Sequence, residues 1–280
     1  MKKKFSTIAG VTLIEILIGL IISVIMMGAM YTSYAVVNST YSQITDRAKI
    51  SQSGRDIIGM LMRDIRMAGY KYFNDNIKTD NVKHAPLVIT KRSNANPPID
   101  CDKIEIVYGG VDYDKNASPK YTYTRYKITY QCKPSNIIDK AVPGGATKVQ
   151  AFAIYKSKKK WDVSGAGVWA DPATDGNDKT YPDQKIVDYV QDLVFHATNE
   201  KGRIISPPPD PTKNNNVDKL YSIKTVDFAL TMRSKNNFFK SSKLRRILAL
   251  SDSTRDIAKT DKYLRDTIIV SAHARNLGLE

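Results

Sequence analysis

A single uninterrupted apolar run dominates the beginning of the chain. Residues 11–37 carry only one charged side chain, Glu15. At about 1.5 Å per helical residue this run reaches roughly 40 Å, which is enough to cross a hydrocarbon core of about 30 Å. Three lysines at positions 2–4 stand directly before it. By the positive-inside rule they stay in the cytoplasm, so the pattern predicts a single membrane span with the remainder of the chain outside.

Beyond Val37 the pattern changes to that of an amphipathic helix. No proline occurs before Pro86, so nothing forces a break at the membrane surface. We predict one helix from Val11 to Ala68, with Gly69 as its C-terminal stop. Its apolar positions recur at spacings of three, four or their sums: Ile44, Ala48, Ile58, Leu61, Ile65 and Ala68. The charged positions fall on the other faces: Asp46, Arg47, Lys49, Arg55, Asp56, Arg63, Asp64 and Arg66.

After Tyr70 the pattern is that of short strands separated by turn residues and long polar loops. Because no long helix intervenes, we predict an antiparallel sheet packed on the second half of the N-terminal helix, an α+β arrangement. The predicted strands are Leu87–Lys91, Lys103–Tyr108, Tyr121–Tyr130, Val149–Tyr155, Ile186–His196, Ile223–Arg233 and Asp266–Ala274. The predicted loops are Ser93–Asp100, Ser135–Lys148, Ser157–Asp183 and Ser206–Lys219.

The two cysteines, Cys101 and Cys132, form an even count in a compartment expected to be oxidising. A bridge between them would close a loop of about 30 residues and stabilise the fold by roughly 3–4 kcal/mol in the chain-entropy model. Two free buried thiols are the alternative. Their spacing does not fit a metal site.

Three interpretations compete for the N-terminal segment. A cleaved secretory signal would have an apolar stretch of about 7–15 residues, which is shorter than this one. A plain signal anchor fits the length but gives no reason for Glu15, whose ionised side chain costs a few kcal/mol in lipid. The third interpretation comes from the segment Gly10-Val11-Thr12-Leu13-Ile14-Glu15. This segment, placed between a basic leader and an apolar helix, resembles the type IV prepilin processing site.

The resemblance implies a role for three of these residues. Prepilin peptidase would cleave after Gly10 and methylate the new N-terminus at Val11, where phenylalanine is the common choice in the family. Glu15 would be the assembly residue, because its carboxylate can pair with the new α-amine of a neighbouring subunit and so set the register between helices. A glutamate that merely lies near the lipid headgroups is the alternative.

A second resemblance narrows the family. The run Leu61-Met62-Arg63-Asp64-Ile65-Arg66-Met67-Ala68-Gly69-Tyr70 is similar to the helix end of PilW-type minor pilins, and the J-type pseudopilins of type II secretion are close relatives. It implies the pilin fold and a low-abundance subunit that takes part in pilus assembly or initiation. The expected segments are a leader (1–10), a transmembrane assembly helix (11–37), its amphipathic continuation (38–69) and an exported domain (70–280).

The implied partners and location follow from the same resemblance. The partners are prepilin peptidase, other major and minor pilins, the inner-membrane assembly platform and membrane lipid. The chain would cross the inner membrane once, with its N-terminus in the cytoplasm and its C-terminal domain in the periplasm, before it enters a filament. A pseudopilin of a type II secretion system, or a DNA-binding minor pilin in DNA uptake, is the alternative.

Nothing in the sequence supports catalysis or a cofactor. The three histidines, His84, His196 and His273, are far apart, and no HExxH, G-x-S-x-G or phosphate-loop motif is present. We therefore predict no enzyme activity and no metal. Two segments are calcium candidates. The first departs from the pattern of an EF-hand calcium loop, and the second has only the acidity of its loop in its favour. They are Asp112-x-Asp114-x-Asn116, which has Ala117 and Tyr123 at its sixth and twelfth positions, and Asp171, Asp175, Asp178 and Asp183.

The net charge is +15, or +12 without the three leader lysines, which suits a partner such as anionic lipid, a surface polymer or DNA. Cations beside aromatic rings favour nucleic acid, and two runs have this composition. The candidate patch is Lys158, Lys159, Lys160 and Trp161, and a second run places Lys240, Lys243, Arg245 and Arg246 after Phe238 and Phe239. A solvated charged face is the alternative for both.

Overall fold

The structure is a computed structural model that divides into two compact units, one up to Ala48 and one from Lys49 onward. We call them the first and the second unit and describe each by itself. The residues described are 10–70, 85–93, 101–138, 148–162, 168–171, 180–210, 217–248, 250 and 255–277.

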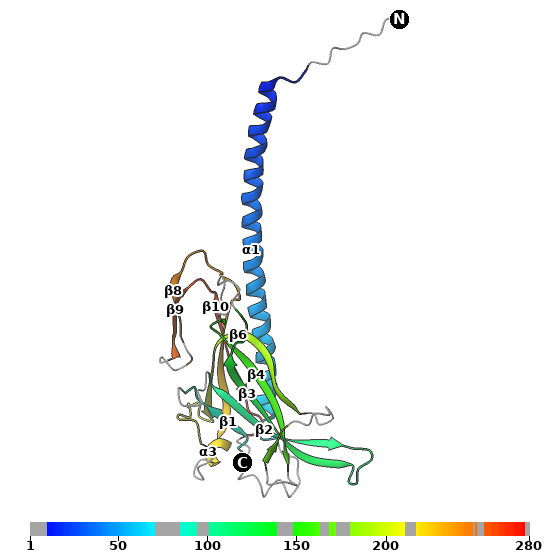
Figure 1. Cartoon of the computed structure of the whole chain (residues 1–280). Coiled ribbons are helices and arrows are strands. Elements are labelled where there is room, and N and C mark those ends of the chain that lie inside the picture. Colours follow the sequence, from blue (N-terminus) through cyan, green and yellow to red (C-terminus); the bar gives the residue numbers. More distant parts are fainter. Residues whose placement is uncertain are drawn as a thin grey trace. The chain divides into compact units, whose positions relative to one another are not determined.

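One helix, α1 (Leu13–Met67), runs through both units, close to the predicted range (Figure 1). Its apolar N-terminal stretch is long and apolar enough to cross a membrane. The helix stops where predicted, because Gly69 adopts the left-handed conformation with φ of 72°. A Cβ atom at Gly69 would also lie 2.5 Å from Cδ2 of Leu277, so the position suits glycine on both counts.

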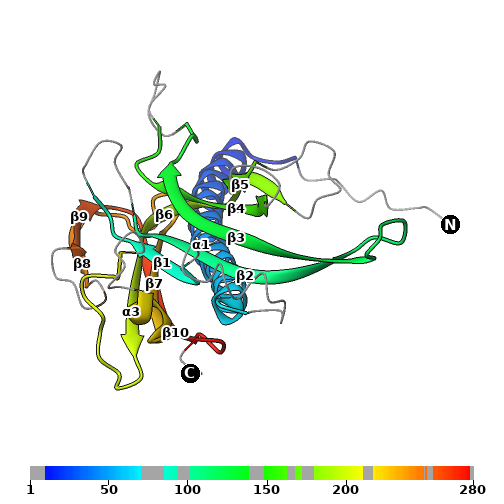
Figure 2. The same cartoon turned by 90° about the horizontal axis from the view of Figure 1, so that it is seen from below.

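The second unit contains an eight-stranded antiparallel sheet in the order β1-β2-β3-β4-β6-β7-β10, with β5 paired to β4. Figures 1 and 2 both show β2 and β3 extending past the other strands as a long hairpin. The strands of this sheet are β1 (Leu87–Thr90), β2 (Lys103–Tyr113), β3 (Tyr121–Pro134), β4 (Phe152–Asp162), β5 (Val168–Ala170), β6 (Tyr181–Asn199), β7 (Ile223–Arg233) and β10 (Arg265–His273). A separate hairpin pairs β8 (Lys243–Ile247) with β9 (Ile257–Asp261), and α3 (Val217–Tyr221) precedes β7.

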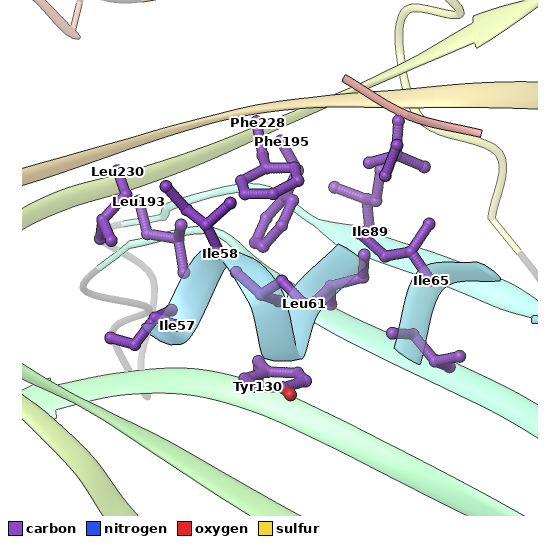
Figure 3. Close-up of a cluster of buried hydrophobic side chains, with 14 of the residues drawn as sticks. Ile57, Ile58, Leu61, Ile65, Ile89, Tyr130, Leu193, Phe195, Phe228 and Leu230 are labelled. Atoms are coloured by element: carbon purple, nitrogen blue, oxygen red, sulfur yellow. The ribbon is translucent and has the colours of Figure 1, made fainter. Parts of the chain in front are cut away.

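The core of the second unit lies between the last turns of α1 and the sheet. Leu61 and Ile65 are fully buried; Leu61 lies between Phe195 and Phe228 on one side and Tyr130 on the other, and Ile65 lies further along the helix, toward Ile89 (Figure 3). Burying a side chain of this size contributes about 1.5–3 kcal/mol, so this helix face anchors the domain. The predicted α+β class is confirmed: a long N-terminal helix packs its second half on an antiparallel sheet.

The strand predictions were correct for the apolar segments and wrong for the charged ones. Strand β7 has the predicted bounds. The predicted loop 157–183 is wrong, because β4 continues to Asp162, β5 follows and β6 begins at Tyr181. The predicted loop 206–219 likewise contains the start of α3, and the β8–β9 hairpin was not predicted. The loop 93–100 lies almost wholly outside the described residues.

A disulfide joins Cys101 to Cys132, as predicted. The two Cα atoms are 5.7 Å apart, within the usual range for a bridge. It links the residue two positions before β2 to the far end of β3, and Cys101 is buried in the core. The bridge therefore fixes one end of the long β2–β3 pair.

Candidate functional site

The residues at the start of α1 form a closed set of hydrogen bonds in the first unit. The backbone N–H and the hydroxyl of Thr12 both donate to Oε2 of Glu15, each at 2.8 Å. The backbone N–H of Glu15 donates in return to Oγ1 of Thr12 at 3.4 Å. This reciprocal arrangement is a capping box, which satisfies N–H groups that the first helical turn leaves without partners. The spacing Thr-x-x-Glu was visible in the sequence, where Glu15 was interpreted only as an assembly residue.

The apolar stretch that follows exposes its large side chains on every side within the first unit. Leu13 is 81% exposed and Met27 69% exposed. A helix that is apolar all round is stable only when lipid or other helices cover it. The Glu15 carboxylate is therefore held in a defined orientation at the N-terminal end of an apolar helix surface that lipid or other helices must cover.

In the second unit, a buried charge couples α1 to the sheet. Asp64 was predicted on a charged helix face, but it is buried, and its Oδ2 accepts from Nζ of Lys156 on β4 and from the hydroxyl of Tyr130 on β3, each at 2.6 Å. Lys156 also lies over the Tyr130 ring, 5.2 Å from its centroid. The prediction was wrong because the helical pattern shows only which residues are charged. The counter-charge that stabilises Asp64 in a buried position is Lys156, on a strand 92 positions later.

Two effects raise the pKa of Tyr130 well above its ordinary value of 10.0. The larger is burial of the hydroxyl, and the second is the nearby negative charge of Asp64. In the unfolded chain Tyr130 loses its proton near pH 10, but in the folded chain it keeps it. Its contribution to stability is therefore complete below pH 10 and is lost as the pH rises further, by about 1.4 kcal/mol per pH unit. We expect Tyr130→Phe to abolish this loss between pH 10 and 11, measured by urea unfolding of the full chain in detergent micelles with tryptophan fluorescence.

The control for this prediction is Tyr121→Phe, because Tyr121 is 59% exposed. It should keep the wild-type pH dependence. At pH 7, Tyr130→Phe should lose about 1.5–3 kcal/mol, since Asp64 is deprived of one hydrogen bond to a charged group. Parallel stability curves for wild type and Tyr130→Phe above pH 10 would contradict the assigned role of the hydroxyl proton.

A second buried charge network joins three segments that are far apart in the chain. Asp102 is fully buried and accepts from the backbone N–H of Phe195 at 2.9 Å, from Nζ of Lys91 at 3.0 Å and from the guanidinium of Arg255. The same guanidinium also binds Asp192, with Nε 3.2 Å from Oδ2. Arg255 precedes β9, so this network attaches the β8–β9 hairpin to the sheet. Sequence reasoning did not find it, because no local pattern links these positions.

The structure divides the predicted nucleic-acid patch between two faces of the sheet. Side chains alternate along a strand, and the register pairs Lys158 with the buried Ile128, so Lys158 and Lys160 point toward the α1 side. Lys159 and Trp161 point to the opposite side. The four residues therefore do not form the single continuous surface that was predicted.

The two halves of the run have different surroundings. Lys159 binds Asp171 at 2.6 Å, and the Trp161 ring meets the edge of Trp169 with centroids 5.1 Å apart. On the other face, Lys158 lies 4.1 Å from the Tyr126 ring centroid. In the second cation run, the Arg245 guanidinium stacks on Phe239 at 3.5 Å. Packing on aromatic rings thus explains several cations without a nucleic acid.

The structure does not bring the candidate calcium ligands together, as far as it describes them. Asp171 pairs with Lys159, whose hydrogen bond lowers the pKa of that carboxyl, and Asp183 pairs with Lys133 at 2.6 Å. Asp114 accepts from the backbone N–H of Asn116, which is a local turn interaction. Asp175, Asp178 and the side chain of Asp112 lie outside the described part. Within the described residues no group of three or more His, Cys, Asp or Glu side chains could hold a metal.

The histidines have ordinary surroundings where the structure describes them. Nε2 of His196 lies 2.7 Å from the backbone oxygen of Leu250, and His273 is exposed at the end of β10. His84 lies outside the described residues. The two described histidines are on different strands and show no arrangement of nucleophile and base.

Comparison with known proteins gives only distant structural matches. No family model and no curated protein matches the sequence. Among solved structures, a type IV-like pilin from Thermus thermophilus matches with 10% sequence identity and a TM-score of 0.42, covering 81% of this chain and 96% of that chain. A match at this level carries no functional argument, so the functional interpretation depends on the residues of the chain itself.

Proposed function

We propose that the chain is a type IV pilin-like subunit that is cleaved after Gly10, methylated at Val11 and inserted into a filament through α1. The observation that carries this proposal is the coincidence of the Gly10–Glu15 motif with the start of an exposed apolar helix. A plain membrane anchor has no need of a carboxylate at its entrance, whereas a helix bundle can use that charge to fix the register of its members.

In this proposal residues 1–10 are the leader, 11–37 the transmembrane assembly segment, 38–69 its continuation and 70–280 the exported domain. The chain inserts once in the inner membrane with its N-terminus in the cytoplasm and its domain in the periplasm. Prepilin peptidase, other pilins, the assembly platform and lipid are its proposed partners. The similarity of residues 61–70 to PilW-type sequences supports a minor subunit of pilus assembly, and a J-type pseudopilin of type II secretion is the alternative.

The test is to shear surface filaments from cells and determine the N-terminal residue of this chain by mass spectrometry. We expect the chain in the filament fraction, beginning with N-methyl-Val11. The control variant is Gly10→Val, which should remain uncleaved; a side chain at this position would meet no neighbouring atom within 4 Å. A chain found only in membranes with its leader intact would identify a signal anchor and contradict the proposal.

A further inference from the structure

A cavity of about 800 Å³ lies in the second unit beside the C-terminal end of α1. Its walls come from the last turns of α1, from β2, β3 and β4, and from the residues that follow β10. We call it the arginine–tyrosine groove, after the two residue types that give it its character. None of its lining residues that the structure describes is acidic.

The floor of the groove is aromatic and firmly built. Tyr126 is 3% exposed, and its ring lies 5.8 Å from that of Tyr108, centroid to centroid. A Cβ atom at Gly110 would be 2.6 Å from Cε2 of Tyr126, so only a glycine there lets the ring lie against β2. Nζ of Lys158 lies over both rings, 4.1 Å from the ring centroid of Tyr126 and 5.7 Å from that of Tyr108. The floor is therefore a fixed apolar surface with a positive charge above it.

The rim of the groove is formed by three arginines. Arg63 and Arg66 are exposed on the last turns of α1, and Arg275 is exposed after β10. The side-chain amide of Asn276 donates to the backbone oxygen of Arg66 at 3.1 Å, which holds the two chain segments together. Within the described part of the chain, Arg66 and Arg275 have no ion-pair partner. Among the described residues the ion-pair partner of Arg63 is Asp64, at 3.5 Å, and Asp64 is held more closely by Lys156, at 2.6 Å.

This composition points to a protein partner. Tyrosine, methionine and arginine are the residue types enriched at protein interfaces, whereas acidic residues are depleted there; the groove adds Met62 and Met67 to its tyrosines and arginines. Exposed arginines bind carboxylates through paired hydrogen bonds. A single-stranded nucleic acid would instead need open aromatic faces for stacking. Among the described tyrosines of the groove only Tyr70 is exposed, and Tyr126 is buried beneath Lys158, so the groove lacks the row of open rings on which successive bases stack.

We propose that the arginine–tyrosine groove binds a segment of another protein chain in which an apolar side chain is flanked by carboxylates. The apolar group would contact Met62, Met67 and the exposed Tyr70, and the carboxylates would pair with Arg66 and Arg275. This inference goes beyond the proposed function and does not depend on it, because the groove exists in the second unit whether or not the chain is cleaved or enters a filament.

The test measures binding of a fluorescent random copolymer of glutamate and tyrosine to the full chain in detergent micelles, at 150 mM salt. We expect saturable binding that weakens at least tenfold in R66E/R275E. The matched control is K201E/R203E, which makes the same change in charge at exposed positions of the turn after β6 and should bind as wild type does. Polyglutamate without tyrosine should bind at least tenfold more weakly than the copolymer.

Several outcomes would overturn the proposal. They are no binding by wild type, equal losses in the two double variants, and equal binding of polyglutamate and copolymer. Tighter binding of a 20-nucleotide oligothymidine, lost in R66E/R275E, would identify a nucleic-acid site instead. As a folding control, the urea midpoints of R66E/R275E and K201E/R203E should equal that of the wild type. Failure of N-terminal cleavage in cells would leave this result untouched, so the two proposals can fail separately.

Discussion

Replacing Arg255 with methionine is expected to destabilise the second unit by about 3–5 kcal/mol. The methionine keeps the apolar stem but removes the guanidinium that neutralises Asp102 and Asp192. Both carboxylates are buried; Asp102 keeps its ion pair with Lys91, but Asp192 loses the guanidinium and its buried charge is left uncompensated. Urea unfolding of the full chain in micelles, followed by the fluorescence of Trp161 and Trp169, measures the loss.

Two further variants make this prediction specific. Adding Asp192→Asn to Arg255→Met should recover part of the lost stability, because the buried charge that Arg255 no longer neutralises is then removed. Lys185→Met breaks an ion pair with Asp188 in which the lysine is 46% exposed, so it should cost less than 1 kcal/mol. A loss below 1 kcal/mol for Arg255→Met would mean that water enters the network.

Replacing Glu15 with alanine is expected to leave the chain cleaved and membrane-bound but nearly absent from filaments. The helix of a subunit that lacks this charge has no counterpart for a neighbour's α-amine and no preferred register. The quantity to measure is the amount of this chain in sheared filaments relative to membranes, by immunoblot, with an expected fall of at least tenfold.

The capping box requires that this prediction be separated from a local effect on the helix. Glu15→Gln keeps an oxygen that can accept from Thr12 but removes the charge, whereas Thr12→Ala removes the hydroxyl and keeps the charge. If the charge pairs between subunits, Glu15→Gln assembles poorly and Thr12→Ala assembles well. The opposite pattern would show that Glu15 acts by capping the N-terminus of α1.

The parts of the fold that could be predicted are those in which a local pattern carries the information. The helix from Leu13 to Met67 follows from one apolar run and one amphipathic run, and its end follows from Gly69. Apolar residues recur along the whole length of strand β7, and this strand was predicted with its observed bounds. Strand β4 was predicted only up to Tyr155, because Lys156–Lys160 have the composition of a solvated loop.

The parts that could not be predicted depend on partners distant in the sequence. Lys156 is buried because Asp64 and Tyr130 meet it from α1 and β3, and Asp102 is buried because Arg255 arrives 153 positions later. The candidate patch failed for a related reason. A run of cations looks continuous in sequence, but a strand sends alternate members to opposite faces. Only the register with β3 shows that Lys158 belongs to the arginine–tyrosine groove.

The anchoring of α1 by Asp64 also has a mechanical consequence. If the chain is a filament subunit, as proposed, a load that enters through the N-terminal end of α1 reaches the sheet through the turns that carry Ile57, Leu61 and Ile65. Sliding the helix by one turn, about 5.4 Å, would shear all these contacts together and would leave both Asp64 and Lys156 buried without a counter-charge. The domain should therefore resist axial pulling more strongly than its apolar contacts alone would allow.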